Sequence, residues 1–256
     1  MDEGMRGSRP TMAPATRPFL TAEWRDLVML NYEIDPAALT PLVPAGTELD
    51  TWQGRTLVSL VGFLFIHTRV LGAPIPRHRN FEEVNLRFYV RRRSDGTWRR
   101  AVVFVKEIVP RRAIAFLARI LYGENYVALP MSHMVADDPA TGLRRVSYAW
   151  TAGGREHRMD LTAAGMPHPI QDGSEEEFIT EHYWGYSRAR NGGTLEYQVT
   201  HPRWRVWRAR EAGFDGDGGA LYGPRFAESL GGPPASALLA EGSPVTVYRG
   251  VSLTAS

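Results

Sequence analysis

Cysteine is absent from this 256-residue chain, and lysine occurs only once, as Lys106. Without cysteine the chain has no disulfides, no thiolate metal ligands and no cysteine nucleophile. The lack of disulfides fits a reducing compartment, so we expect a cytoplasmic protein. All the other basic residues are arginines, which confines any lysine chemistry to one position.

Long apolar runs are also missing. None reaches the roughly 20 residues that a membrane helix needs, and the longest, residues 57–66, is interrupted by Ser59 and Gly62. Residues 1–17 are rich in glycine, proline, methionine and arginine and lack the apolar core of a signal peptide. We predict a disordered tail over residues 1–17 with Met12 as an alternative start, one domain over residues 18–256, and no membrane partner.

Neither sign of charge is in large excess, since the chain has 30 lysine and arginine residues and 28 aspartate and glutamate residues. This balance argues against nucleic acid as a partner. The arginines at 91–93 and 99–100 flank an expected turn and could contact phosphate. A solvated hairpin tip explains them better, because the rest of the chain offsets their charge.

Metal and phosphate motifs do not occur. The seven histidines show no tight metal-ligand spacing, and His78 and His133 are interpreted as solvated residues beside loops or strand ends. The glycine-rich stretch 213–219 lacks the lysine and the strand–loop–helix context of a phosphate loop. We therefore predict no metal and no cofactor.

The patterns that are present are mostly those of strands. The clearest is a hairpin, in which residues 82–92 alternate, residues 94–97 (Ser-Asp-Gly-Thr) supply turn chemistry, and residues 98–109 are rich in β-branched side chains. Further strands are expected over residues 27–32, 56–66, 127–135, 143–150, 156–161, 195–200, 203–209 and 245–251. This content indicates a mainly β (α+β) fold, a barrel or sandwich with a few appended helices.

Four helices are expected between these strands. Asp35 and Pro36 supply the N-cap and first position of one, residues 110–121 have the apolar spacing of another, and residues 224–230 form a third. Ser174 and the three glutamates after it form a capping box. That box predicts a helix with Phe178, Ile179, His182, Tyr183 and Tyr186 on one face, which continues to the Asn-Gly-Gly at 191–193.

The opening of the chain resembles that of the acetoacetate decarboxylases. Arg25, residues 27–32, 35–39 (Asp-Pro-Ala-Ala-Leu) and 42–44 (Leu-Val-Pro) carry the likeness, and Arg25 precedes Tyr32 by the seven residues that separate an active-site arginine from a tyrosine there. Residues 81–84 (Phe-Glu-Glu-Val) are similar to a segment with a catalytic-site glutamate, which Glu83 matches. Residues 113–115 and Arg119 resemble the helix before that family's lysine pair.

The Schiff-base lysine of that family would fall near Tyr126, and residues 122–127 contain no lysine. Its second acidic residue would lie near residues 57–61, where Ser59 is the nearest polar group. The chain looks closer to the YqjF-like branch of the superfamily, whose pattern resembles residues 83–90, 107–115 and 178–183. The likeness runs from about residue 17 to residue 253. It implies an acetoacetate decarboxylase-like β-barrel with a few appended helices, and no particular activity.

Candidate site residues begin with Glu83, Asn85, Arg87 and Tyr89, which share one face of their strand because side chains alternate. If this face looks inward, it lines a pocket for a carboxylate or carbonyl compound, with Glu83 catalytic and with Asn85 and Arg87 binding substrate. If it looks outward, it is an ordinary solvated face. The pattern alone favours the solvated face, and the match at Glu83 weighs against it.

Arg25 and Tyr126 complete the candidates that the resemblance implies. In the functional interpretation, Arg25 binds an acidic substrate or forms an ion pair with Glu83. In the alternative interpretation, it is a surface arginine near the start of a strand. In the functional interpretation, Tyr126 donates a proton or a hydrogen bond at the position of the family's lysine. In the alternative interpretation, it is a core tyrosine whose hydroxyl has a hydrogen-bond partner within the protein.

Lys106 is a candidate on chemical grounds. A lysine desolvated among apolar residues can act as an amine nucleophile, so Lys106 could be a relocated Schiff-base lysine. The simpler interpretation is a lone lysine in an arginine-rich chain, with its ammonium reaching a strand end or pairing with a carboxylate. The position, about twenty residues before the expected one, favours the simpler interpretation.

Two functions follow from these observations. The first is binding of a small carbonyl or carboxylate compound in a barrel pocket, with acid–base lyase or isomerase chemistry rather than Schiff-base decarboxylation. The second is a non-catalytic ligand-binding or interaction protein on the same barrel. The absence of the decarboxylases' Schiff-base lysine and of their second acidic residue favours this function. Either function is compatible with a homo-oligomer.

Overall fold

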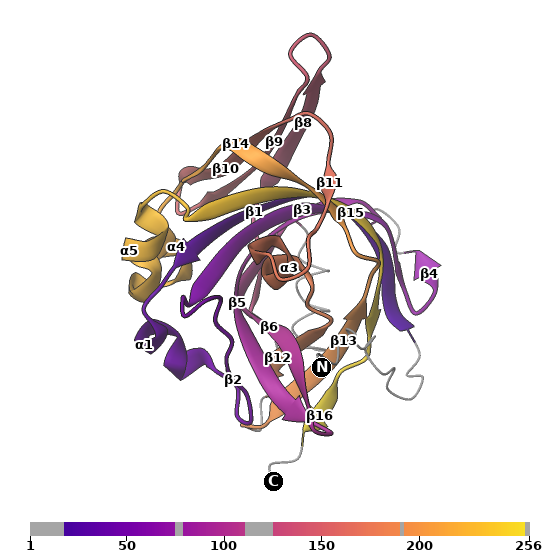
Figure 1. Cartoon of the computed structure of the whole chain (residues 1–256), viewed down its shortest axis with the longest axis vertical. Helices are drawn as coiled ribbons and strands as arrows, with labels where there is room; N and C mark the ends of the chain where they lie inside the picture. Colours follow the sequence, from indigo (N-terminus) through magenta and orange to yellow (C-terminus); the bar gives the residue numbers. More distant parts are fainter. Residues whose placement is uncertain (1–17, 75–78, 111–124, 190–191, 254–256) are drawn as a thin grey trace, which may run out of the picture.

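The computed structural model describes residues 18–74, 79–110, 125–189 and 192–253, and strands dominate it (Figure 1). The strands are β1 (Pro18–Glu33), β2 (Glu48–Leu49), β3 (Leu57–Val70), β4 (Ala73–Pro74), β5 (Phe81–Ser94), β6 (Thr97–Val109), β7 (Tyr126–Ala128), β8 (Met131–Asp138), β9 (Leu143–Ala152), β10 (Arg155–Ala164), β11 (His168–Pro169), β12 (Trp184–Arg188), β13 (Thr194–Thr200), β14 (Arg205–Asp215), β15 (Ser236–Tyr248) and β16 (Val251–Leu253). The helices are α1 (Pro36–Leu39), α3 (Glu175–Thr180), α4 (Gly218–Tyr222) and α5 (Ala227–Gly231), with 3-10 turns η1 (Thr40–Leu42) and η2 (Pro224–Phe226). The prediction of a mainly β fold is confirmed.

Several sequence-based predictions lie outside the described residues. They are the tail over residues 1–17 with Met12, His78, the helix beyond residue 110, and Arg119.

Hydrogen-bonded strands close into a ring around the interior of the molecule. β13, β12, β6, β5, β3, β1 and β15 pair in that order, and β15 pairs back with β13 through Val199 and Thr200. Within the ring, only the β12–β6 pairing is parallel. Closure leaves the ring with an inner and an outer face, and side chains alternate between them.

A bend in β1 determines which side chains face the interior. Asp26 has a φ of 56°, and the pairing of β1 with β3 shifts register between Arg25 and Val28. Across the strand, Gly242 on β15 has a φ of 77°, and a Cβ there would lie 1.9 Å from the carbonyl oxygen of Trp24. The bulge shifts the alternation by one residue, so that Trp24 and Leu27 both face inward.

A second bulge lies in β6, which forms the predicted hairpin with β5. Asp95 and Gly96 both have positive φ, as a two-residue hairpin turn requires. Leu86 pairs with Lys106 but Arg87 pairs with Phe104, so Val105 is the extra residue. As a result Glu107 faces the interior and Lys106 faces outward.

The outer face of the ring is covered by a second group of strands, β8, β9 and β10, with β14 joining them to β15. Their buried side chains form one cluster with the outward-facing residues of β1, β3 and β5. The approach is close at Gly62, where a Cβ would lie 2.6 Å from the ring of Tyr148 and 2.7 Å from Met159 Sδ. Both faces of β5 are therefore buried, and its polar row faces inward.

Helix α3 lies inside the ring (Figure 1), where Phe178 and Ile179 belong to the interior cluster. Its N-cap is Ser174, whose side chain accepts from the Glu177 N–H as predicted. The predicted continuation to residues 191–193 is wrong, because Trp184–Arg188 forms β12 and pairs with β13 and β6. Those long-range backbone hydrogen bonds override the helical periodicity, and His182 falls in the short connection between α3 and β12.

Smaller differences occur elsewhere. Pro130 separates β7 from β8, where one strand was predicted, and the closing strand starts at Ser236 rather than residue 245. The short helices predicted at Pro36 and over residues 224–230 are present. Among the described residues, no helix has the length and apolarity needed to cross a membrane.

Candidate functional site

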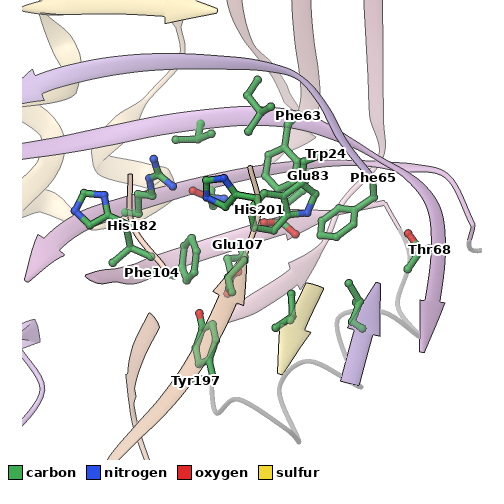
Figure 2. A pocket seen from close by; sticks show the side chains of 18 of the residues that line it. Trp24, Phe63, Phe65, Thr68, Glu83, Phe104, Glu107, His182, Tyr197 and His201 are labelled. Carbon is green, nitrogen blue, oxygen red and sulfur yellow. Dashed lines mark hydrogen bonds between the residues drawn. The ribbon is translucent and has the colours of Figure 1, made fainter. Parts of the chain in front are cut away.

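A cavity of about 130 Å³ lies inside the ring, between the inner faces of β1, β3, β5 and β6 and the segment after α3. Figure 2 shows aromatic and polar side chains gathered around it. Much of the wall is aromatic. Phe65 stacks on Phe81 with centroids 4.6 Å apart, and Trp24 meets Phe63 edge-on at 5.3 Å. A ligand with an apolar body would be favoured there, because burying apolar surface is favourable.

A polar row crosses one wall of the cavity. Asn85 on β5 pairs with Glu107 on β6, and Glu107 pairs with Tyr126 on β7. Asn85 Nδ2 donates to Glu83 Oε1 at 3.1 Å, and the Tyr126 hydroxyl donates to Glu83 Oε2 at 3.5 Å. Glu83 is 3% exposed and Glu107 is 1% exposed. Two buried carboxylates, an amide and a phenol therefore face the same space.

Arg87 continues this row toward α3. Its Nη2 donates to the carbonyl oxygen of Ile179 at 2.9 Å, and its Cζ lies 5.7 Å from the centre of the Tyr89 ring. Nε is buried and has no hydrogen-bond partner among the described residues. In the described part of the chain no carboxylate forms an ion pair with Arg87, whose guanidinium lines the same cavity as Glu83 and Glu107.

His182 lies at the same end of the cavity. Its ring packs on Tyr89, with centroids 4.9 Å apart, and neither ring nitrogen has a hydrogen-bond partner among the described residues. Burial lowers the pKa of His182 well below 6.5, and the charges of Arg100 and Arg87 lower it further. The backbone carbonyl of Ile179 acts in the opposite direction and raises the pKa. The imidazole is therefore neutral near pH 7.

His201 lines the cavity next to Trp204, with which it stacks at 4.3 Å. Its Nδ1 lies 3.0 Å from the Pro202 carbonyl oxygen. Burial is the main cause that lowers the pKa of His201. This second neutral ring has one nitrogen already engaged, unlike His182.

A buried chain of hydrogen bonds fixes the interior wall below α3. Ser59 Oγ donates to Asn31 Oδ1 at 2.6 Å, so its 2.5 Å contact with Tyr89 is donated by the tyrosine hydroxyl. Asn31 Nδ2 donates to Ser236 Oγ at 2.9 Å, and Ser236 donates to Glu175 in α3. Each donor in this chain points toward the carboxylate of Glu175, which ties α3 to four strands of the ring, β5, β3, β1 and β15.

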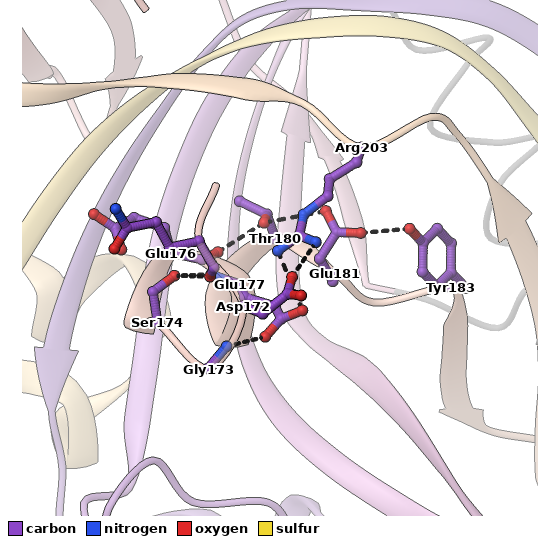
Figure 3. A network of polar contacts seen from close by, with 10 residues as sticks. Asp172, Gly173, Ser174, Glu176, Glu177, Thr180, Glu181, Tyr183 and Arg203 are labelled. Carbon is purple, nitrogen blue, oxygen red and sulfur yellow. Dashed lines mark hydrogen bonds and ion pairs between the residues drawn. The ribbon is translucent and has the colours of Figure 1, made fainter. Parts of the chain in front are cut away.

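The outer side of α3 is held by ion pairs (Figure 3). Arg203 contacts Asp172 at 2.5 Å and Glu177 at 3.2 Å, and Glu177 also accepts from the Gly173 N–H at 2.6 Å. Tyr183 donates to Glu181 at 2.5 Å on the far side of His182. The segment that carries His182 is therefore fixed on both sides.

Of the residues selected from the sequence, Glu83, Asn85, Arg87 and Tyr126 meet at this cavity. Arg25 lies outside it. Its Nη2 pairs with Glu23 at 2.5 Å, and 41% of its side chain is exposed, because the bulge at Asp26 turns it outward.

Lys106 also lies away from the cavity, on the outer face of β6. Its Nζ donates to the Leu221 carbonyl oxygen and lies 5.8 Å from the centre of the Tyr222 ring. Burial lowers the pKa of the ammonium. In this position the only lysine cannot reach a compound bound beside Glu83.

Glu107, His182 and His201 also line the cavity and were not selected from the sequence. Glu107 was missed because simple alternation places it on the face opposite Phe104, and no glycine marks the bulge at Val105. His182 was assigned to a helix face, and His201 follows a strand with no motif around it. An acidic residue within the apolar run 101–109 was the one signal that pointed to Glu107.

Metal ligation has no support from the described residues, in which no group of three or more histidine, aspartate or glutamate side chains is placed to hold an ion.

Comparison with known proteins places these observations in a family. The family model DUF2071, described as an uncharacterized conserved protein, matches residues 21–244. The uncharacterized protein YqjF of Bacillus subtilis (strain 168) is 38% identical over 68 residues, which make up 26% of this chain and 28% of that protein. That match thus spans little more than a quarter of the relative's length.

Solved structures are similar over nearly the whole chain. An acetoacetate decarboxylase-like enzyme from Sphingomonas wittichii RW1 has a TM-score of 0.67 at 15% identity, covering 98% of this chain and 100% of that one. Acetoacetate decarboxylase from Legionella pneumophila has a TM-score of 0.67 at 13% identity, covering 98% and 93%. The enduracididine biosynthesis enzyme MppR, complexed with pyruvate, has a TM-score of 0.64 at 14% identity, covering 96% and 93%. These similarities confirm the predicted acetoacetate decarboxylase-like fold.

Proposed function

The chain belongs to the DUF2071 family of uncharacterized conserved proteins, and from the lining of its cavity we propose that it binds a small carbonyl or carboxylate compound. One protein of the same fold, MppR, is described in complex with pyruvate, which carries both groups. The cavity of this chain offers partners for each of them.

The observation that carries the proposal is the position of Arg87. Its guanidinium lines the cavity, its Nε has no partner among the described residues, and its one strong hydrogen bond goes to a backbone carbonyl. The guanidinium is half-buried and forms no direct ion pair among the described residues. A ligand carboxylate would supply such a partner and matches the forked donors of arginine.

Acid–base chemistry is the activity that the polar row supports. Glu83 or Glu107 would take a proton from the carbon next to a bound carbonyl group. The Tyr126 hydroxyl would donate a hydrogen bond to the carbonyl oxygen as negative charge develops on it. This arrangement suits enolisation, dehydration or hydration, and so a lyase or isomerase.

A Schiff base at this cavity is disfavoured because Lys106, the only lysine, lies on the outer face of β6. We expect that treatment with borohydride and 4-methyl-2-oxopentanoate adds no mass to the peptide that contains Lys106. Trapping of the ligand on that peptide would contradict this part of the proposal.

A second candidate is a protein that binds the compound without converting it, which the absence of a lysine in the cavity favours. The two are distinguished by exchange of the C3 protons of 4-methyl-2-oxopentanoate in D2O, followed by NMR. An acid–base enzyme accelerates this exchange, and Glu83→Gln or Glu107→Gln slows it at least about tenfold. A non-catalytic binder binds the compound without accelerating exchange.

Binding itself is tested by titration calorimetry with 4-methyl-2-oxopentanoate and pyruvate. We expect Arg87→Gln to weaken binding about 10- to 150-fold, because hydrogen bonds to a charged group contribute about 1.5–3 kcal/mol. Arg25→Gln, at an exposed arginine outside the cavity, serves as the matched control and should bind as the wild type does. Normal binding by Arg87→Gln with weakened binding by Arg25→Gln would overturn the proposal.

A further inference from the structure

We propose that His182 is a specificity-determining residue that recognises a second oxygen on the ligand, so that the cavity selects 2-oxo or 2-hydroxy carboxylic acids with an apolar body. This inference rests on the proposed function, because it assumes that Arg87 holds the carboxylate of the same ligand.

The first support is the unsatisfied hydrogen-bonding capacity of His182. The side chain is buried, lines the cavity, and has no hydrogen-bond partner at Nδ1 or Nε2 among the described residues. Buried polar groups in proteins nearly always have partners, and an unpaired one is costly. A ligand in the cavity can supply the missing partner.

The second support is the ring's protonation state. A neutral imidazole has one N–H donor and one acceptor nitrogen. The donor suits a ligand carbonyl oxygen, and the pair together suits a hydroxyl group. The positive charges of Arg87 and Arg100 also disfavour a cationic group on the ligand next to this ring.

The third support is the position of His182 relative to Arg87. The centre of the His182 ring lies 4.9 Å from the centre of the Tyr89 ring, and Arg87 Cζ lies 5.7 Å from that same centre. Both side chains also line the same cavity, and the charge of Arg87 acts on the His182 ring. With the carboxylate on Arg87, the ligand would present the oxygen on its adjacent carbon to His182.

The rest of the ligand would lie against the aromatic wall. Trp24, Phe63, Phe65 and Phe81 line the same cavity and contact one another. Each buried methylene group favours binding by about 0.8 kcal/mol. Three additional apolar carbons therefore favour 4-methyl-2-oxopentanoate over pyruvate by roughly 50-fold.

The imidazole is held in place rather than free to turn away. The hydrogen-bond chain from Tyr89 through Ser59 and Asn31 fixes the ring beneath it, and the contacts of Glu175 and Arg203 fix the segment around it. A site built in this way rejects an analogue that lacks the matching group, because its polar atoms are then left unpaired.

The test uses three acids with one carbon skeleton, namely 4-methyl-2-oxopentanoate, 2-hydroxy-4-methylpentanoate and 4-methylpentanoate. Calorimetry on the wild type should show that the two oxygenated acids bind about tenfold more tightly than 4-methylpentanoate. His182→Phe, which keeps the ring stacking, should abolish that ratio. His182→Gln, which keeps a donor and an acceptor, should retain part of it.

A measurement on the wild type keeps the test decisive if the variants fold poorly. The ring nitrogen resonances of His182 in 15N-histidine-labelled protein should shift with 2-hydroxy-4-methylpentanoate and not with 4-methylpentanoate. Equal affinities for all three acids, or equal shifts, would overturn the inference and leave carboxylate binding intact. If none of the acids binds, the proposed function itself fails.

Discussion

Two neighbouring residues of β6, Lys106 and Glu107, lie on the faces opposite to those that strict alternation predicts. The extra residue Val105 reverses the alternation. As a result the carboxylate of Glu107 faces the cavity and the ammonium of Lys106 faces away from it. Alternation within β5 grouped Glu83, Asn85 and Arg87 on one face, and the resemblance at Glu83 made that face a candidate site. Alternation could not select Glu107, because a bulge formed by a β-branched residue leaves no mark in the sequence.

The burial of Lys106 predicts a measurable shift. Because it is the only lysine, a lysine side-chain resonance in selectively labelled protein reports this residue alone. Burial lowers its pKa, so the resonance should titrate below the ordinary value of 10.5. Lys106→Arg removes the signal and serves as the assignment control. A midpoint at or above 10.5 would contradict the buried position on the outer face of β6.

His182 predicts a pH-dependent loss of stability. Its folded pKa lies below the unfolded value of 6.5, so the unfolded chain binds the extra proton as the pH falls. Stability from the neutral ring is complete above pH 6.5 and is lost as the pH falls below it. Between about pH 7.5 and pH 5.5, the wild type should lose up to about 1.4 kcal/mol more unfolding free energy than His182→Phe does. Urea unfolding of the wild type and of His182→Phe at the two pH values measures these losses. Equal losses of unfolding free energy in the two proteins would contradict a buried neutral His182.

At the scale of elements, the hairpin β5–β6 was predictable and the segment after α3 was not. Asp95 and Gly96 encode their turn locally. The apolar spacing of the segment is helical, yet residues 184–188 form a strand because β13, the next strand in the chain, and β6, far away in the sequence, offer them backbone partners. Local pattern cannot reveal such partners, and this is also why His182 was assigned to a helix rather than to the cavity.

The bend between β1 and β15 is the element-scale feature on which the cavity wall depends. Gly242→Ala places a Cβ 1.9 Å from the Trp24 carbonyl oxygen in a backbone conformation with a φ of 77°. We expect a loss of at least about 3 kcal/mol in unfolding free energy, or failure to accumulate folded protein. Gly232→Ala is the matched control, since nothing lies within 4 Å of a Cβ there. Equal stability of the two variants would show that this bend is not needed.

At the scale of the whole molecule, strand content and the resemblance predicted the fold class, whereas closure of the ring could not be derived. It depends on the pairing of β13 with β15, two strands whose sequences carry no sign of each other. The second group of strands on the outer face buries the apolar side of β5. That burial leaves the polar row only the interior to face, which settles the inward or outward orientation of Glu83 and Asn85.

The central claim is that one ring-enclosed cavity binds a small carboxylate through Arg87. A crystal structure of the protein with 4-methyl-2-oxopentanoate tests it most directly. The account predicts that the carboxylate lies within hydrogen-bond distance of the Arg87 guanidinium, that the 2-oxo oxygen faces His182, and that the methyl groups contact the aromatic wall. Ligand bound on the outer surface at Arg25 or Lys106, with the cavity empty at saturating concentration, would contradict it.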